Sequence, residues 1–123
     1  MARILIIDDE VALLESLSLA ISKAGHVVET AANGRDAARL FAAQPADLIL
    51  TDIVMPDEAG LDFIRDLRRK QPKLPIIAMS GGITNSPLYA IGVAGRLGAN
   101  KILAKPFPTV ELLQAIDETL AGK

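Results

Sequence analysis

The feature that most limits the fold of this chain is a regular alternation of short apolar runs with longer segments of helical periodicity. The runs have the length and composition of buried strands and lie at residues 4–7, 26–31, 48–51, 75–80 and 101–104. Between and after them, apolar residues recur at helical spacing, which predicts helices from Glu10 to Ala24, from Asn33 to Ala42, around Leu61–Leu67, from Pro87 to Leu97 and, capped by Thr109, on to Leu120. Strands that alternate with helices in this way form a parallel sheet with helices on both faces.

The connections between these elements leave few arrangements of the sheet. Right-handed crossovers and the known doubly wound orders favour an α/β fold, a flavodoxin-like five-stranded parallel sheet of order 2-1-3-4-5 with five helices. In that order the first and third strands are neighbours, about 4.8 Å apart. A chain of 123 residues is long enough for one core but not for two, so residues 1–123 are expected to form one domain.

Composition and charge exclude several classes of protein. Half of the residues are hydrophobic and the formal net charge is −2, the balance of an ordinary globular domain. The longest basic run, Arg68-Arg69-Lys70, sits where a helix C-terminus favours positive charge and does not indicate nucleic-acid binding. The chain has no cysteine and no segment of membrane-spanning length, and no signal peptide is expected. We therefore expect a cytoplasmic protein with neither a nucleic-acid nor a membrane partner.

Two of the apolar runs end in aspartates, which are costly in a buried strand. Asp8 and Asp9 follow the first run, and Asp52 follows the third. In the predicted strand order these side chains meet at the carboxyl edge of the sheet, at the switch of strand order where ligands bind. Acids so close together either retain a proton or share a cation. With oxygen ligands alone, the expected ion is Mg²⁺ before Ca²⁺.

Two further polar residues end strands at the same edge. Ser80 closes the fourth apolar run with a hydroxyl, and Lys105 follows the fifth with a point charge suited to phosphate. Carboxylates are known phosphoryl acceptors, and acids, a hydroxyl and a lysine around a metal would stabilise a phosphoryl group in transfer. Each residue alone also has an ordinary interpretation, with an aspartate as a helix cap, Ser80 as a loop hydroxyl and Lys105 as a solvated side chain.

The same residues belong to a set of motifs that resembles the receiver domain of two-component response regulators. The set consists of the Asp8-Asp9 pair, the run D-I-V-M-P-D-E-A-G over 52–60, Ser80-Gly81, and G-A-N-K-I-L-A-K-P-F over 98–107. Each motif is short, but together, in this order and near the spacing of the family, they are highly specific. The resemblance extends over essentially the whole chain.

The resemblance implies a role for each acid at the strand ends. Asp52 resembles the acceptor that becomes an aspartyl phosphate. Asp9 resembles the direct Mg²⁺ ligand, and Asp8 is expected to contribute through water. The main-chain carbonyl of Val54 is a further expected ligand of the ion.

Roles for two more residues, and one departure, follow from the same resemblance. Lys105 would hold a phosphate oxygen, with its peptide bond to Pro106 in the cis form, and Ser80 would hydrogen-bond the new phosphate. The family also has an aromatic switch residue on the last strand. Ile102 stands at that position here, which places switching by an aromatic ring in doubt.

The implied function is that of a phospho-accepting signalling domain in a two-component system or phosphorelay. Transfer from a sensor histidine kinase or a histidine phosphotransfer protein to Asp52 would switch binding to a downstream protein target. The domain would catalyse only its own phosphorylation and dephosphorylation and is not otherwise expected to be an enzyme. A homodimer is left open, and the chain is either a stand-alone receiver or a piece of a longer protein.

Two other classes of protein share parts of this pattern. A metal-dependent hydrolase of the haloacid dehalogenase type also uses a nucleophilic aspartate, but it needs a second acid two residues later. Asp52 has Val54 at that position, and Asp8 has Glu10. A flavodoxin-type electron carrier needs a hydroxyl- and glycine-rich loop after the first strand and aromatic residues around the flavin. This chain has acids in that loop and few aromatic residues.

Overall fold

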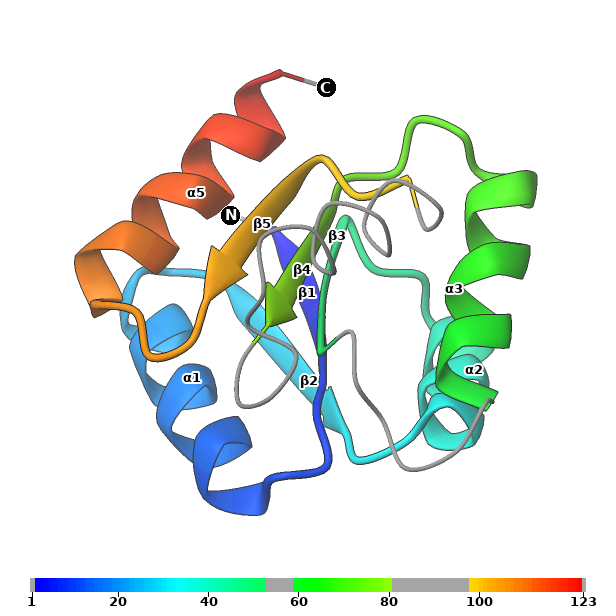
Figure 1. The fold of residues 1–123 in the computed structure, drawn as a ribbon, viewed down its shortest axis with the longest axis horizontal. Coiled ribbons are helices and arrows are strands. Elements are labelled where there is room, and N and C mark those ends of the chain that lie inside the picture. The colour runs from blue at the N-terminus through cyan, green and yellow to red at the C-terminus, as the bar shows by residue number, and fades with distance from the viewer. Residues whose placement is uncertain (1, 53–58, 81–97, 123) are drawn as a thin grey trace.

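The computed structural model describes residues 2–52, 59–80 and 98–122 of the chain (Figure 1). The strands are β1 (Arg3–Ile7), β2 (Val27–Ala31), β3 (Leu48–Asp52), β4 (Ile76–Ser80) and β5 (Lys101–Ala104). The helices are α1 (Val11–Lys23), α2 (Gly34–Ala43), α3 (Ala59–Lys70) and α5 (Thr109–Ala121). The helix predicted over 87–97 lies outside the described residues.

The strands form one five-stranded parallel sheet in the order β2-β1-β3-β4-β5, which confirms the predicted flavodoxin-like arrangement. Of the five predicted helices, four are present among the described residues. In the register of β1 and β3, Ile7 lies opposite Thr51. This pairing brings the residues that follow β1 beside the last residue of β3.

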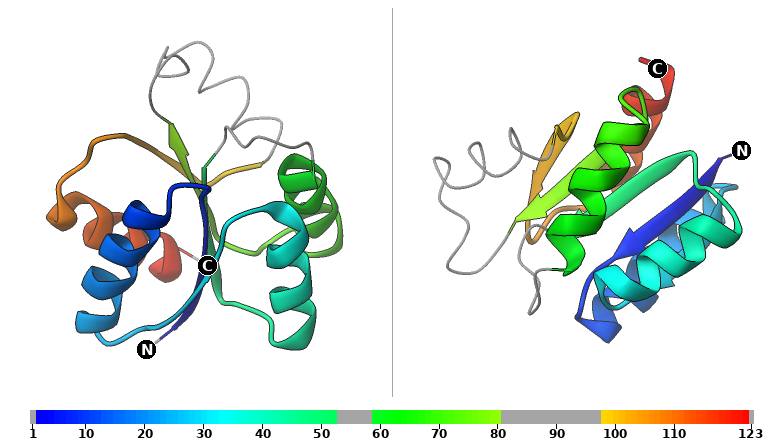
Figure 2. Two further views of the ribbon diagram at one scale, coloured as in Figure 1. Left: turned by 90° about the horizontal axis from the view of Figure 1, so that it is seen from below. Right: turned by 90° about the vertical axis from the view of Figure 1, so that its right-hand side faces the viewer.

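The helices cover the sheet in two layers, with α1 and α5 on one face and α2 and α3 on the other (Figure 2). Each layer closes one half of the hydrophobic core. The half under α1 and α5 contains Leu14, Leu17, Ile21, Leu112, Ala115 and Ile116. The half under α2 and α3 contains Ala37, Phe41, Ile64 and Leu67. Burial of each large apolar side chain contributes about 1.5–3 kcal/mol, so both layers hold the strands in place.

The strands differ in burial according to their place in the sheet. β3 and β4 are buried along their whole length, as expected for parallel strands covered on both faces. β5 is an edge strand and is buried only at Leu103. Ile102, at the position of the expected switch residue, is 38% exposed on this strand.

Local chemistry explains two of the helix boundaries. The Asn33 side chain accepts the N–H of Asp36 and caps α2 as predicted. Gly25 ends the turn after α1 with φ at +98°, a conformation that favours glycine. The prediction of Thr109 as a helix cap is wrong, because Thr109 is the first residue of α5 and the extended Pro108 precedes it.

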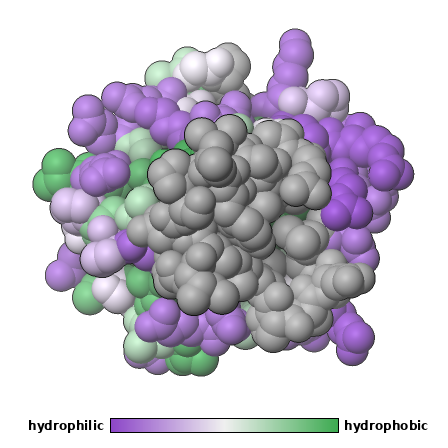
Figure 3. All heavy atoms as spheres, in the orientation of Figure 1, coloured by the Kyte–Doolittle hydropathy of each residue, from purple (hydrophilic) through white to green (hydrophobic). Residues whose placement is uncertain are grey.

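The helix α3 has an apolar face and a charged face. Ile64 and Leu67 are buried, whereas Asp62, Arg65 and Asp66 are exposed. The surface is accordingly hydrophilic along the right-hand edge of the molecule, where α3 lies (Figure 3). Within the described ranges, none of the helices combines the length and the apolar character that a membrane crossing requires.

Candidate functional site

Acidic residues converge at the carboxyl edge of the sheet, where β1 and β3 end side by side. Asp8 and Asp9 follow β1, and Asp52 is the last residue of β3. One carboxylate oxygen of each of these three residues lies within 4.8 Å of the others. Asp8 and Asp52 are buried, whereas Asp9 is exposed. The sheet therefore brings together the acids that the sequence places at the two strand ends.

Asp8 is held in place from both carboxylate oxygens. Its Oδ1 accepts the backbone N–H of Glu10 at 2.9 Å, at the start of α1. Its Oδ2 accepts a hydrogen bond from Lys105 Nζ at 2.7 Å. Asp8 thus fixes the residue that precedes α1. It is not the helix cap of the ordinary interpretation, because Glu10 holds the cap position and no side chain of the described residues caps this helix.

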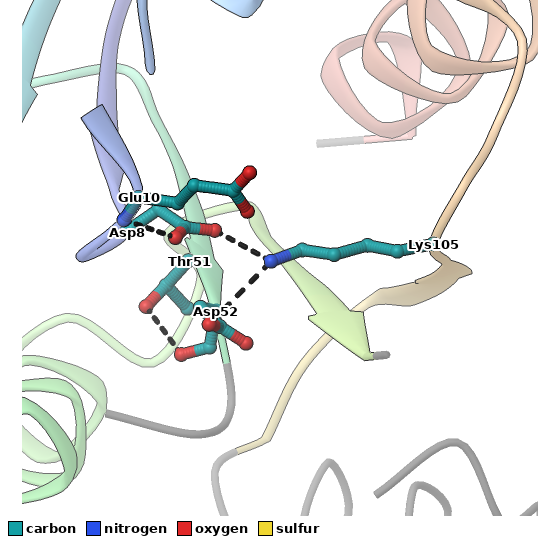
Figure 4. Close-up of polar contacts among 5 residues, drawn as sticks. All are labelled: Asp8, Glu10, Thr51, Asp52 and Lys105. Atoms are coloured by element: carbon teal, nitrogen blue, oxygen red, sulfur yellow. Dashed lines mark hydrogen bonds and ion pairs between the residues drawn. The ribbon is translucent and has the colours of Figure 1, made fainter. Parts of the chain in front are cut away.

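Lys105 is the cation of the cluster. Its ammonium group lies between the carboxylates of Asp8, at 2.7 Å, and Asp52, at 3.5 Å (Figure 4). Partial burial lowers the pKa of Lys105, but the hydrogen bond to Asp8 and the charges of Asp52 and Asp8 outweigh it. The pKa of Lys105 therefore lies above its usual value of 10.5. In this structure the lysine offsets part of the repulsion between the acids.

Ser80 joins the ends of β4 and β5 at the same edge. It is the last residue of β4 and is only 2% exposed. Its main-chain oxygen accepts the backbone N–H of Lys105 at 2.6 Å. The peptide bond between Lys105 and Pro106 is cis, as the resemblance implied. Val54, the expected carbonyl ligand, lies outside the described residues.

The donor set of the cluster fits Mg²⁺. Asp8, Asp9 and Asp52 each supply a carboxylate oxygen, the ligand that this ion prefers. The carboxylate of Asp9 makes no hydrogen bond or ion pair with any other described residue, and it is exposed. It is therefore available to an ion that arrives from solvent.

Comparison with known proteins decides the family. The sequence profile of the response regulator receiver domain matches residues 4–117. The chain belongs to this family. This receiver domain is 40% identical over 119 residues to the DNA-binding transcriptional regulator NtrC of Azospirillum brasilense. It is 39% identical over 111 residues to the response regulator MprA of Mycolicibacterium vanbaalenii.

These matches cover most of the chain but only part of the relatives. The NtrC match covers 97% of this chain and 24% of the relative, and the MprA match covers 90% and 47%. The receiver domain thus spans less than half of the length of these relatives. Among solved structures, chemotaxis protein CheY4 of Vibrio cholerae matches with a TM-score of 0.86 and 29% identity, over 97% of this chain and 98% of that one. NtrX of Brucella abortus in complex with ADP matches with a TM-score of 0.89 and 26% identity, over 98% of this chain and 27% of that one.

The structure adds one contact of the receiver site that the sequence did not indicate. Lys105 was expected to hold phosphate, and in this structure it contacts Asp8 more closely than Asp52. Residues 8 and 105 are 97 positions apart, so no local pattern links them. A chemical argument could have suggested the contact, because buried carboxylates at a strand end need a nearby cation and Lys105 follows a strand that ends at the same edge.

The contribution of Lys105 to stability is expected to depend on pH. Because its folded pKa is raised above 10.5, its ion pairs stabilise the metal-free fold fully below that pH and are lost as pH rises through the folded pKa. The measurement is the difference in unfolding free energy between wild type and Lys105→Met, from urea denaturation in EDTA. We expect it to be constant from about pH 7 to about pH 9.5 and to shrink above about pH 10.5. A difference that disappears near neutral pH would contradict this.

Proposed function

We propose that this receiver domain, over residues 1–123, accepts a phosphoryl group on Asp52 in a Mg²⁺-dependent step. The observation that supports the proposal is the grouping of the Asp8, Asp9 and Asp52 carboxylates within 4.8 Å. The ammonium of Lys105 lies against two of these carboxylates. A buried carboxylate beside a metal site and a lysine is suited to accept a phosphoryl group, because the surrounding charges stabilise the transferring oxygens.

Mg²⁺ would be held by the acid cluster together with the main-chain carbonyl of Val54. The ion would supply charge neutralisation, both for the acids and for the oxygens of the incoming phosphoryl group. Because Mg²⁺ is usually bound through one or two carboxylates and keeps several waters, not every acid needs to be a direct ligand. The exposed Asp9 suits direct coordination, and the buried, hydrogen-bonded Asp8 suits a contact through water.

In the transfer step, a carboxylate oxygen of Asp52 attacks the phosphorus of a phosphohistidine. An O–P bond forms while the P–N bond of the donor breaks, and the electron pair of that bond stays on the imidazole. Lys105 would turn from Asp8 and Asp52 to an oxygen of the new phosphate, since its ammonium is already within 3.5 Å of Asp52. The hydroxyl of Ser80, at the end of the neighbouring strand, would donate a hydrogen bond to the same group.

The phosphate would act as a switch through its charge. It adds close to two negative charges and strong hydrogen-bond acceptors where β3, β4 and β5 end. The resulting change in Ser80 and Lys105 would bias the receiver toward a second conformation with altered protein binding. The donor would be a sensor histidine kinase or a histidine phosphotransfer protein, and the switched partner a downstream protein.

The test is incubation with acetyl phosphate and Mg²⁺, followed by intact mass spectrometry. Wild type is expected to gain the mass of one phosphoryl group, and Asp52→Asn is expected to gain none. Asp62→Asn removes an exposed acid of α3 outside the cluster and is expected to be labelled like wild type. An unlabelled wild type with Mg²⁺ present, or a labelled Asp52→Asn, would overturn the proposal.

A further inference from the structure

A second polar cluster lies at the end of the sheet opposite the acids, around the guanidinium of Arg68. Nη1 of Arg68 donates to the carbonyl oxygens of Gln71, at 3.2 Å, and Pro72, at 2.8 Å. Nη2 donates to the carbonyl oxygen of Gly98, at 2.8 Å, and to Oδ1 of Asn100, at 3.2 Å. One side chain thus joins the end of α3 to the residues that lead into β5.

The partners of this guanidinium are all neutral. No carboxylate of the described residues lies within salt-bridge distance of Arg68. Its Nε is buried and has no hydrogen-bond partner in the described part of the chain. Burial also lowers the pKa of Arg68. Burying a charge without a counter-charge costs free energy of desolvation, so the Arg68 contacts are expected to add little to stability. They are better suited to fixing the positions of the backbone groups that the guanidinium contacts.

Asn100 extends the contacts of Arg68 to the beginning of β4. Its backbone N–H donates to the carbonyl oxygen of Ile76 at 2.7 Å. Its Oδ1, which also accepts from Arg68, accepts the N–H of Ile76 at 2.9 Å. Asn100 therefore holds the first residue of β4 from both backbone groups, and Arg68 holds Asn100.

Gly98 lets the arginine approach the backbone this closely. Its φ is +72°, where a side chain would be strained. A Cβ at this position would also lie 2.9 Å from Nε of Arg68. The backbone of Gly98 is thus shaped to receive the guanidinium.

The strand between this cluster and the acid cluster is short and lies at the edge of the sheet. β5 has four residues, and β4 is its neighbour in the described sheet. At its beginning, β5 is tied to Ile76 and Arg68 through Asn100. At its end, the N–H of Lys105 donates to the carbonyl oxygen of Ser80. The position of Lys105 therefore depends on how both ends of β5 are held.

We infer that Arg68 is a positioning residue for Lys105. By fixing Asn100 and the beginning of β5 against β4 and α3, it sets where β5 ends. It thereby sets how Lys105 lies against Asp8 and Asp52. The consequence for phosphoryl transfer rests on the proposed function, but the effect on β5 and Lys105 does not.

The direct test is amide hydrogen exchange, measured by NMR on the metal-free protein. Arg68→Met keeps most of the aliphatic stem and removes every donor. We expect the amides of both Asn100 and Lys105 to exchange about tenfold faster in this variant, while amides of the central strands β1 and β3 are unchanged. Arg69→Met is the matched control, because Arg69 is exposed and pairs only with Asp66 among the described residues. It should leave all of these rates unchanged.

Two results would overturn the inference. Faster exchange at Asn100 with no change at Lys105 would show that Arg68 acts only on its own surroundings. Equal acceleration in every strand would show a general loss of stability. If Arg68→Met folds poorly, Arg68→Lys replaces it, because lysine keeps the charge and one donor group. In Arg68→Lys we expect the amides of Asn100 and Lys105 to exchange at rates between those of wild type and Arg68→Met. Uniformly faster exchange of all strands in both variants would also refute the role of Arg68.

Phosphorylation gives a second measurement. In acetyl phosphate with saturating Mg²⁺, Arg68→Met is expected to be labelled on Asp52 severalfold more slowly than Arg69→Met. A wild type that is never labelled would refute the proposed function and would leave the exchange result standing. Labelling at the Arg69→Met rate, with Lys105 exchange unchanged, would refute the role of Arg68 alone.

Discussion

Replacing Lys105 with methionine is expected to lower the unfolding free energy of the metal-free protein by about 2–3 kcal/mol. The ammonium group is the cation closest to two buried carboxylates, at 2.7 Å from Asp8 and 3.5 Å from Asp52. Without it, the carboxylates of Asp8 and Asp52 repel each other more strongly. Breaking a fully buried pair costs more, about 3–5 kcal/mol, but the Lys105 side chain is 21% exposed and water screens part of the effect.

Mg²⁺ is expected to recover much of this loss. The ion would take over the charge compensation that the lysine supplies, so it should bind the folded Lys105→Met protein more tightly than it binds wild type. A ligand that binds only the folded state at 100 times its dissociation constant adds about 2.7 kcal/mol of stability. Urea denaturation of both proteins in EDTA and in Mg²⁺ therefore measures how strongly the lysine and the ion compete.

Lys101→Met is the matched control for this experiment. Lys101 is the first residue of β5, the strand that Lys105 follows, and it forms an ion pair with Glu118, but both side chains are more than one-third exposed. Exposed pairs contribute about 0–1 kcal/mol, and neither residue belongs to the acid cluster. The loss in Lys101→Met should be small and insensitive to Mg²⁺. Equal losses in the two variants, or a loss in Lys105→Met that Mg²⁺ does not reduce, would refute the role of Lys105 as the cation of the cluster.

The strand order and the position of the acids were accessible from the sequence for a simple physical reason. Apolar runs such as 48–51 have the composition of buried strands, and their alternation with helices permits few topologies. Once β1 and β3 are neighbours, the chain connectivity alone places Asp8 and Asp52 at one edge. These predictions depend on backbone geometry and burial, and both can be inferred from the local pattern of apolar and polar residues.

Contacts between distant side chains were not accessible in the same way. The sequence marked Arg68 only as part of a basic run at a helix end, yet its partners Gly98 and Asn100 lie 30 and 32 positions away. Likewise, nothing in the pattern near Lys105 indicated that Asp8 would be its nearest partner. Which distant side chains come into contact depends on the paths of the loops in the folded chain. It also depends on the need of buried polar atoms for hydrogen-bond partners. The family resemblance supplied roles for residues, but not these contacts.

The acids of the cluster are expected to separate into a structural and a metal-binding residue. Asp9→Ala should change stability by no more than about 0.5 kcal/mol in EDTA, because Asp9 is exposed and makes no polar contact with the other described residues. The same variant should bind Mg²⁺ at least about tenfold more weakly, because the ion usually has only one or two carboxylate ligands. Calorimetric titration with Mg²⁺ measures the affinity.

In the absence of metal, Asp8→Ala should destabilise the protein, whereas Asp9→Ala should not. It removes the acceptor of the Glu10 N–H and the closest partner of Lys105, and we expect it to cost about 2–3 kcal/mol of stability. Asp8→Asn keeps an oxygen for Glu10 and should retain part of that stability, which separates the helix contact from the charge. Two results would contradict this division of the cluster between Asp8 and Asp9. Asp9→Ala could destabilise the metal-free protein as much as Asp8→Ala does, or it could bind Mg²⁺ as tightly as wild type. Either result would show that Asp9 is not the metal-binding residue.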